Sequence, residues 1–215
     1  MQTSKNKKIY FYAPNVWTGG GKVLILSIIN LIIKNKKNNN FYMILDERIK
    51  NELSSDYNIK TFFCKKSIFS RLFCEYKFSK KAKKNDIILI FNNVSLVFST
   101  KAKCMMYLQH ILFTGKYSPN KYSNKFKIKI IYSIYYLINK FFSKKIKKYY
   151  VQTISMKNEI IKNYNNKSVT LFPFLSEEID ENLFEKINTY NFIYPASNYF
   201  HKNHKNLLNA FKILS

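Results

Sequence analysis

Along most of the chain, short runs of β-branched and aromatic residues alternate with longer segments in which apolar residues recur at helical spacing. This alternation is typical of strands joined by crossover helices, which bring successive strands into a parallel sheet with helices on its faces. We therefore predict an α/β fold, a Rossmann-like parallel sheet flanked by helices. The predicted strands are residues 9–13, 41–45, 59–63, 87–91, 104–108, 149–152 and 169–172.

Two of the intervening segments give clear helix signals. Residues 22–35 carry apolar residues at helical spacing, which predicts a first helix with one buried face. Ser155 is a residue type that caps helix N-termini, and it predicts the start of a helix that extends to Asn163.

A third segment, residues 124–148, combines an apolar stripe with many lysines. At helical spacing the stripe consists of Ile128, Ile131, Tyr135, Ile138 and Phe142. Such a basic amphipathic helix can lie on an anionic membrane, and it can equally be an ordinary helix packed on the sheet. Both interpretations hold if part of the stripe is exposed.

The alternation breaks after residue 172. Pro173 cannot continue a regular helix, and five acidic residues gather within residues 176–186 of an otherwise basic chain. We therefore predict a first domain over residues 1–172, followed by an interdomain linker over residues 173–188.

A fresh strand and helix follow the predicted linker. Within residues 189–215, the segment 191–194 has strand character and the segment 205–214 has helical spacing. One strand and one helix cannot bury a sheet face on their own. This unit either opens a second, incomplete Rossmann-like domain or packs onto the first domain.

The chain is strongly basic. Lysine and arginine number 37 against 12 aspartate and glutamate residues, and the formal net charge is +25. Nearly all of the excess is lysine, as biased base composition of the gene would produce. A functional attraction to anionic lipid or to phosphate-bearing substrates is the other explanation, and the sequence leaves both open.

Three cysteines, Cys64, Cys74 and Cys104, are too few and too far apart for a zinc ribbon or a disulfide framework. They favour a reduced, cytosolic setting. The sequence also has neither a signal-peptide core at its start nor an apolar run of about 20 residues that could span a membrane. We expect a cytoplasmic protein, soluble or peripheral at the inner face of the cell membrane.

Gly19, Gly20 and Gly21 account for three of the four glycines in the chain and stand between the first predicted strand and the first predicted helix. A glycine cluster there lets backbone N–H groups approach an anion at the helix N-terminus. A tight structural turn is the alternative. The spacing matches neither a Walker loop nor the GxGxxG fingerprint.

Histidines mark two further candidate positions. His110 follows the predicted strand 104–108, at the end where open α/β sheets bind ligands, although a lone histidine can also be a hydrogen-bonded loop residue. His201 and His204, interleaved with Lys202 and Lys205, stand at the start of the last predicted helix, where a basic loop suits a diphosphate or is simply a solvated helix start.

Four parts of the chain, in this order, resemble the GT-B glycosyltransferases of the large retaining family 4, the glycosyl transferase group 1 type. They are YAPNVWTGGGKVL at residues 12–24, YLQH at 107–110, VQTISMK at 151–157 with VTLFP at 169–173, and FIYPAS at 192–197 with HKNHKNLLNAF at 201–211. The resemblance implies that residues 1–172 are the acceptor-binding N-terminal domain and that residues 189–215 begin the donor-binding domain.

The same resemblance implies a reaction and a site. A sugar would pass from a nucleotide-sugar to an acceptor hydroxyl with retained anomeric configuration, without a metal or another cofactor. It places Gly20 and Gly21, within the loop that begins at Gly19, near the donor phosphates and the acceptor. It places His110 near the sugar as the catalytic candidate, and it makes Lys202 a phosphate-binding residue. Ser197 stands where many members have an arginine, which leaves more of the charge neutralisation to Lys202.

The expected partners are therefore a nucleotide-sugar, a glycan or lipid-linked acceptor of surface polysaccharide synthesis, and an anionic membrane surface. We expect the 215-residue chain to be inactive alone, because it stops soon after the donor-binding domain begins. The alternatives are a non-catalytic nucleic-acid-binding module and a peripheral membrane-binding module. We expect no nucleic-acid partner, because the sequence has no recognition motif and almost no arginine.

Overall fold

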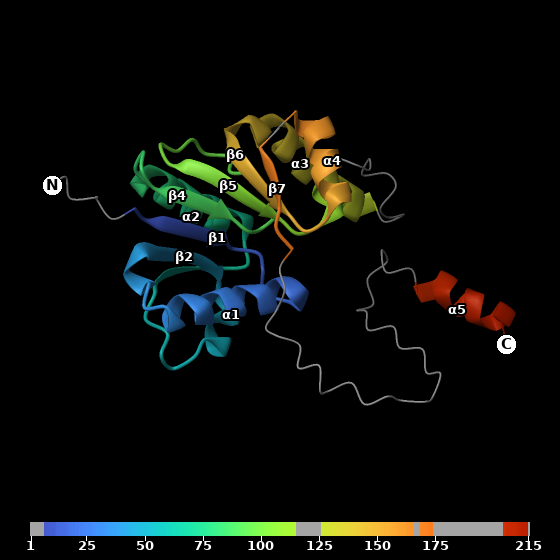
Figure 1. Ribbon diagram of the computed structural model, residues 1–215, viewed down its shortest axis with the longest axis horizontal. Coiled ribbons are helices and arrows are strands. Elements are labelled where there is room, and N and C mark those ends of the chain that lie inside the picture. Colours follow the sequence, from blue (N-terminus) through green and yellow to red (C-terminus); the bar gives the residue numbers. More distant parts are fainter. Residues whose placement is uncertain (1–6, 115–125, 166–167, 174–203, 215) are drawn as a thin grey trace.

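The computed structural model describes residues 7–114, 126–165, 168–173 and 204–214. Seven strands, all parallel, form one sheet with the order β3-β2-β1-β4-β5-β6-β7 (Figure 1). The strands are β1 (Ile9–Ala13), β2 (Phe41–Asp46), β3 (Lys60–Cys64), β4 (Ile87–Ile90), β5 (Lys103–Leu108), β6 (Ile146–Val151) and β7 (Val169–Leu171). The predicted parallel sheet flanked by helices is confirmed.

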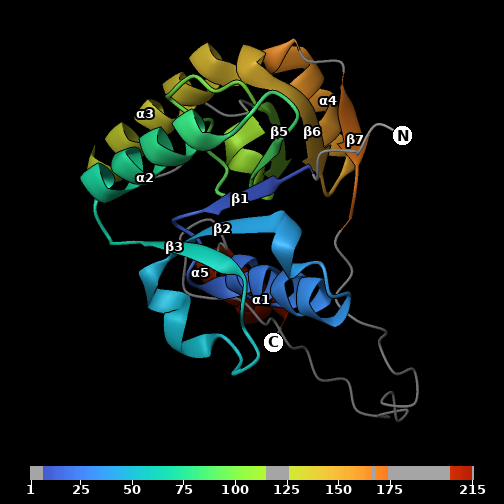
Figure 2. The ribbon, with the colours of Figure 1, turned by 90° about the vertical axis from the view of Figure 1, so that its left-hand side faces the viewer.

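Helices cover the two faces of the sheet unequally (Figure 2). The helices are α1 (Gly19–Lys34), α2 (Ile68–Lys81), α3 (Phe126–Phe142), α4 (Ile154–Tyr164) and α5 (His204–Leu214). Of these five, α2, α3 and α4 lie over one face of the sheet, and α1 lies over the other. The face under α1 is therefore only partly covered, because α2, α3 and α4 all lie on the opposite side.

The period of two in the strands explains how one sheet serves both layers. In β1, Tyr10 and Tyr12 pack into the core under α2, whereas Phe11 and Ala13 pack into the core under α1. All four residues are buried, as expected for a parallel strand covered on both faces.

Two helix starts differ from the sequence prediction. The helix α4 begins at Ile154, and its N-cap is Thr153, whose side chain accepts a hydrogen bond from the backbone N–H of Met156. The predicted cap, Ser155, lies inside the first turn. The helix α1 begins at Gly19, so the glycine cluster forms the first turn of the helix instead of a loop before it.

The predicted basic helix over residues 124–148 is too long. Within the described residues α3 spans Phe126–Phe142, and Ile146 already begins β6. In the predicted stripe, Tyr135, Ile138 and Phe142 are half-buried and pack inward, whereas Ile131 is exposed. The side chain of Ile128 lies outside the described part of the chain. Both packing on the sheet and exposure of part of the helix are therefore observed.

The described part of the C-terminal region is the helix α5, which matches the helix predicted over residues 205–214. The predicted strand over 191–194 and all of the predicted linker except Pro173 lie outside the described residues.

None of the helices in the described ranges combines the length and the apolar character needed to cross a membrane. Cys64, Cys74 and Cys104 are all free and buried.

Candidate functional site

The strand order reverses direction between β1 and β4. The chain builds β2 and β3 on one side of β1 and then returns to build β4, β5, β6 and β7 on the other side. The loops that leave the carboxyl ends of β1 and β4 therefore diverge, and open α/β sheets bind their ligands in the crevice that this leaves. The fold alone points to this edge of the sheet.

A cleft of about 510 Å³ lies at this edge. The loops that follow β1, β2, β3, β4 and β5 all contribute to it, together with the start of α2 and one residue of α3. Its lining residues are Pro14, Asn15, Trp17, Asp46, Arg48, Lys65, Lys66, Ser67, Ile68, Arg71, Asn92, Val94, Phe113 and Tyr135. The volume lies within the range of about 300–1,000 Å³ that is typical of small-molecule sites. We refer to it as the carboxyl-edge cleft.

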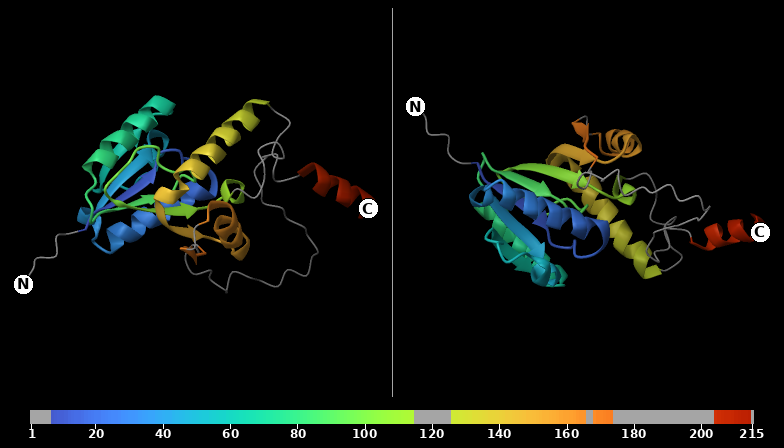
Figure 3. Two further views of the ribbon diagram at one scale, coloured as in Figure 1. Left: turned by 90° about the horizontal axis from the view of Figure 1, so that it is seen from above. Right: turned by 60° about the horizontal axis from the view of Figure 1, so that its bottom comes forward.

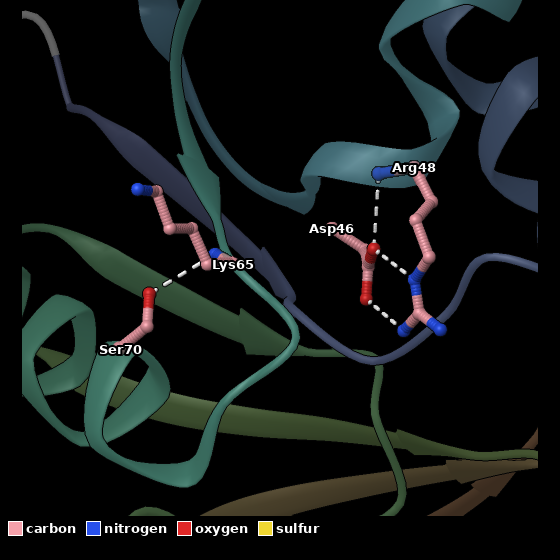
Figure 4. Close-up of polar contacts among 4 residues, drawn as sticks. All are labelled: Asp46, Arg48, Lys65 and Ser70. Carbon is pink, nitrogen blue, oxygen red and sulfur yellow. Dashed lines mark hydrogen bonds and ion pairs between the residues drawn. The ribbon is translucent and has the colours of Figure 1, made fainter.

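A buried carboxylate organises one wall of the cleft (Figure 4). Asp46, the last residue of β2, is almost fully buried and accepts two side-chain hydrogen bonds from Arg48, from Nε at 2.7 Å and from Nη2 at 2.6 Å. It also accepts the backbone N–H of Arg48 at 3.0 Å. These side-chain hydrogen bonds raise the pKa of the Arg48 guanidinium above its ordinary value. The position of Arg48 is thus fixed by a bidentate pair.

The guanidinium of Arg48 also lies 4.0 Å from the centroid of the Trp17 ring. A cation over an indole face is attracted by the ring quadrupole. Asp46 therefore fixes Arg48, and Arg48 in turn fixes Trp17. Since Trp17 leads directly into the glycine cluster, this contact connects the loop after β1 with the loop after β2.

Arg71 enters the cleft from the first turn of α2. The N-cap of this helix is Ser67, which accepts a hydrogen bond from the backbone N–H of Ser70, and the first turn contains no acidic residue. Arg71 is half-buried, and no carboxylate of the described residues forms an ion pair with it. Arg48 and Arg71 therefore differ: the first is neutralised by a buried carboxylate, and the second is not.

The three glycine positions differ in whether they could hold a larger residue. Gly19 has a φ of +63°, a conformation that side chains disfavour. A Cβ on Gly21 would lie 2.7 Å from Val16 Cγ1 and 3.1 Å from Gln109 Oε1. A Cβ on Gly20 would meet no atom within 4 Å. Gly19 and Gly21 therefore have structural reasons to be glycine, whereas Gly20 faces open space.

His110 lies just beyond the end of β5 and is held by the turn after β4. Asn93, at a φ of +61°, accepts hydrogen bonds through Oδ1 from the backbone N–H groups of Gln109 at 2.7 Å and His110 at 3.3 Å. Nδ1 of His110 accepts the backbone N–H of Leu112 at 3.2 Å. In a neutral imidazole the proton therefore sits on Nε2.

Asn93 is itself anchored to α3. The side-chain amide of Asn139 donates to the backbone carbonyl of Asn93 at 3.0 Å, and its Oδ1 accepts the backbone N–H of Ser95 at 2.7 Å. Asn139 is almost fully buried, so the two bonds hold the β4 turn firmly under α3.

The structure thus brings the predicted glycine cluster and His110 to the same edge of the sheet. Gln109, the neighbour of His110, lies against Gly21, and the ring of Phe113 contacts that of His110 at a centroid distance of 5.9 Å. Neither the glycines nor His110 lines the cleft directly. Trp17 and Phe113 do, and they connect the cleft to both.

The sequence prediction did not include Asp46, Arg48, Arg71 and Asn93. One signal was available: Arg48 and Arg71 are the chain's two arginines, and both line the same cleft. Lys202, His201 and Ser197 lie outside the described residues, and His204 is the first residue of α5.

A second cavity, a groove of about 600 Å³, lies on the other face between α1 and the sheet. Its walls are nearly all apolar or aromatic, among them Phe11, Leu31, Leu89 and Met105, and Lys37 is its one charged residue. Although this groove is larger than the carboxyl-edge cleft, it offers almost no group that could orient or polarise a substrate. We therefore assign the candidate site to the cleft.

The structure is a Rossmann-like α/β domain with a basic cleft at the topological switch point of its sheet. The sequence matches no protein-family model and no curated protein. Among the described residues no three His, Cys, Asp or Glu side chains come together as metal ligands would.

Proposed function

We propose that the protein is a retaining glycosyltransferase of the GT-B type and that the described α/β domain is its acceptor-binding half. One observation carries the proposal: a basic cleft at the switch point of the sheet is connected both to the glycine turn that opens α1 and to the His110 turn after β5. The order of the sequence segments that resemble family 4 supports the same function.

In such a transfer, the bond between the anomeric carbon and the nucleotide phosphate oxygen breaks, and a bond from that carbon to an acceptor hydroxyl oxygen forms. The hydroxyl proton leaves with the departing diphosphate. The enzyme accelerates this exchange chiefly by positioning the two substrates and by stabilising the charge that develops on the leaving group.

Three parts of the chain have roles in the proposal. The open space at Gly20 lets a substrate approach the backbone of the first turn of α1. His110, whose backbone N–H donates to Asn93 Oδ1, is proposed to contact the sugar through its imidazole. Lys202 is proposed to bind the donor phosphates, and it lies outside the described residues.

The test is transfer of a labelled sugar from a panel of nucleotide-sugars to membrane acceptors, by the protein supplied with a complete donor-binding domain, which such a transfer requires. We expect His110→Ala to lower the rate by about a hundredfold, as loss of one positioned polar group commonly does. Lys103→Gln, an exposed change at the amino end of β5, serves as the matched control. Absence of transfer from every donor, or equal rates for His110→Ala and Lys103→Gln, would contradict the proposal.

We also propose that the acceptor is reached at an anionic membrane, through the outer surface of α2 and α3. These two helices lie side by side over one face of the sheet (Figure 3). On α3, the row Ile130, Ile134, Leu137 and Phe141 is exposed, at helical spacing. On α2, the row Phe69, Phe73 and Tyr76 is exposed likewise.

The charges around these rows favour an anionic occupant. The single acidic residue of α2, Glu75, is buried, and α3 contains none. Lysines accompany the exposed rings, for example Lys77 at 4.4 Å from the centroid of Phe73. An apolar row flanked by lysines is the arrangement that lies in the interface of an anionic bilayer.

Co-sedimentation with phosphatidylglycerol vesicles tests this surface. We expect the double variant Ile130→Glu and Leu137→Glu to weaken vesicle binding at least about tenfold, because it places two charges in the apolar row. Val23→Glu, an equally exposed apolar position on α1, should bind as the wild type does. Equal binding by both variants would show that this surface is not the one that meets the membrane.

A further inference from the structure

We propose that the carboxyl-edge cleft recognises a phosphate group on the acceptor, with Arg71 as its principal ligand. This inference rests on the proposed function, because it names the class of acceptor that the enzyme would use. It goes beyond that function in assigning a phosphate site that is separate from the donor phosphates.

The charge of the cleft is the first argument. Arg48, Arg71, Lys65 and Lys66 line it, and Asp46 is the one carboxylate among its lining residues. The two arginines contribute more to a phosphate site than the two lysines do. The side chain of Lys65 points away from the Asp46–Arg48 pair (Figure 4), and both lysines are exposed.

The use of arginine is the second argument. The chain uses lysine for nearly all of its positive charge, yet both of its arginines line this one cleft, from α2 and from the loop after β2. Arginine presents planar, bidentate donors that match the oxygens of phosphate, whereas lysine is a mobile point charge. General basic composition would not concentrate arginine at one place.

The difference between the two arginines is the third argument. Arg48 donates through Nε and Nη2 to Asp46 and stacks on Trp17, so it forms a rigid part of the cleft wall. Arg71 is half-buried and forms no ion pair with any described acidic residue. A half-buried guanidinium that forms no ion pair with the described carboxylates attracts an anion from solution more strongly than one paired to a carboxylate does. The N-terminus of α2 beside it adds to the same positive field.

The remaining lining shows what the rest of the acceptor would contact. Trp17, Ile68, Phe113 and Tyr135 give the cleft an apolar and aromatic side. A volume of about 510 Å³ accommodates a phosphate together with a sugar ring or the first part of an isoprenyl chain. The phosphate can therefore belong to a lipid carrier or to a soluble sugar phosphate.

Trp17, the single tryptophan of the chain, gives a direct readout, because it lies in the cleft against Arg48. The full chain is titrated with inorganic pyrophosphate while tryptophan fluorescence is recorded. We expect a saturable change in the wild type and at least about a tenfold weaker affinity in Arg71→Gln, since a charge-assisted bond is lost. Lys103→Gln, at the opposite edge of the sheet, should match the wild type.

Thermal melts of each variant accompany the titration. If Arg71→Gln melts early, Arg71→Met keeps the aliphatic packing and removes the charge, and the same weakening is expected. A wild-type signal that does not saturate would overturn the proposal. So would equal affinities for the wild type and the Arg71 variant, or equal weakening by Arg71→Gln and Lys103→Gln, which would mark a diffuse attraction to the basic surface.

Two further titrations separate the possible sources of the phosphate. Tighter binding of a short isoprenyl monophosphate than of a hexose 1-phosphate assigns a lipid carrier, and the reverse order assigns a soluble sugar phosphate. These titrations require no sugar transfer. If phosphate binds but no sugar is transferred, the glycosyltransferase is rejected and the phosphate site remains. If sugar is transferred but Arg71 does not bind phosphate, the phosphate site is rejected and the glycosyltransferase remains.

Discussion

Two cavities of the domain, the carboxyl-edge cleft and the groove under α1, have similar volumes and opposite chemistry. The carboxyl-edge cleft, about 510 Å³, is built from five loops and contains both arginines and a buried carboxylate. The groove under α1, about 600 Å³, is built from strand faces and one helix and is almost entirely apolar. The sheet itself produces this difference, because its faces carry the alternating apolar residues of the strands whereas its carboxyl edge collects the loops.

This comparison shows that size alone does not identify a site. The groove is larger because α1 covers its face alone, whereas α2, α3 and α4 share the other face. The cleft is smaller, yet its polar groups are held in place by bonds that cost stability when they are broken. Substitutions that disturb the polar framework of the cleft should therefore have larger effects than those that remove a polar group from the groove.

The largest effect is expected at Asp46. Replacing Asp46 with alanine leaves Arg48 without its buried partner and removes the acceptor for its backbone N–H, at a cost of about 3 kcal/mol. Chemical denaturation measures this loss. Glu52→Ala is the control, since its ion pair with Lys22 is partly exposed and is worth less than about 1 kcal/mol. Similar losses for both variants would show that the cleft has no special framework.

A smaller effect is expected at Gly21. A methyl group there approaches Val16, whose β-branched side chain turns with difficulty, and Gln109, so Gly21→Ala should cost about 1–3 kcal/mol. Gly20→Ala meets no atom within 4 Å and should be neutral or stabilise the first turn of α1 by up to about 1 kcal/mol. The melting temperatures of Gly20→Ala and Gly21→Ala measure both effects. A destabilised Gly20→Ala would contradict the assignment of open space at Gly20.

A pH-dependent effect is expected at Glu75, which is buried on α2. Burial raises the pKa of its carboxyl, although the N–H of Phe98 donates to it at 2.8 Å. Its contribution to stability is therefore full below the unfolded-state pKa and is lost as pH rises through the raised pKa. Relative to Glu75→Gln, the wild type should lose stability from pH 4 to pH 7. Parallel stability curves for the two proteins would contradict the raised pKa.

The smallest effect is expected in the groove. The hydroxyl of Tyr107 donates to the backbone carbonyl of Phe172 at 3.2 Å across its wall. Tyr107→Phe should cost about 1 kcal/mol or less and leave pyrophosphate binding unchanged. A large change in phosphate affinity would mean that the two cavities are coupled, which would contradict their independence.

Much of the sheet could be predicted from the sequence because the strands are short runs rich in apolar residues. The central strands β1 and β5 are largely buried, whereas the edge strands β3 and β7 are partly exposed. The sixth strand was predicted to start at residue 149 and starts at Ile146, since Lys147 and Lys148 obscure its beginning. The start of α4 was placed at the wrong cap because Thr153 and Ser155 are equally good cap types, and only the backbone conformation selects between them.

The candidate site was predicted only where a residue type is scarce. Glycine is rare in this chain, so the cluster at 19–21 stood out, and His110 follows a clear strand. Arg48 and Arg71 are 23 positions apart and stand among many lysines. Their meeting depends on the loop after β2 and the start of α2 reaching the same edge, which is a property of the tertiary fold.

An NMR titration of the labelled full chain with inorganic pyrophosphate tests whether the carboxyl-edge cleft binds phosphate. We expect the indole N–H of Trp17 and the backbone amides of Arg71 and Asn92 to shift together and saturate, whereas amides of groove residues such as Leu31 and Leu89 should not move. Shifts centred on the groove, or spread evenly over the lysines, would contradict the assignment of the carboxyl-edge cleft as the binding site.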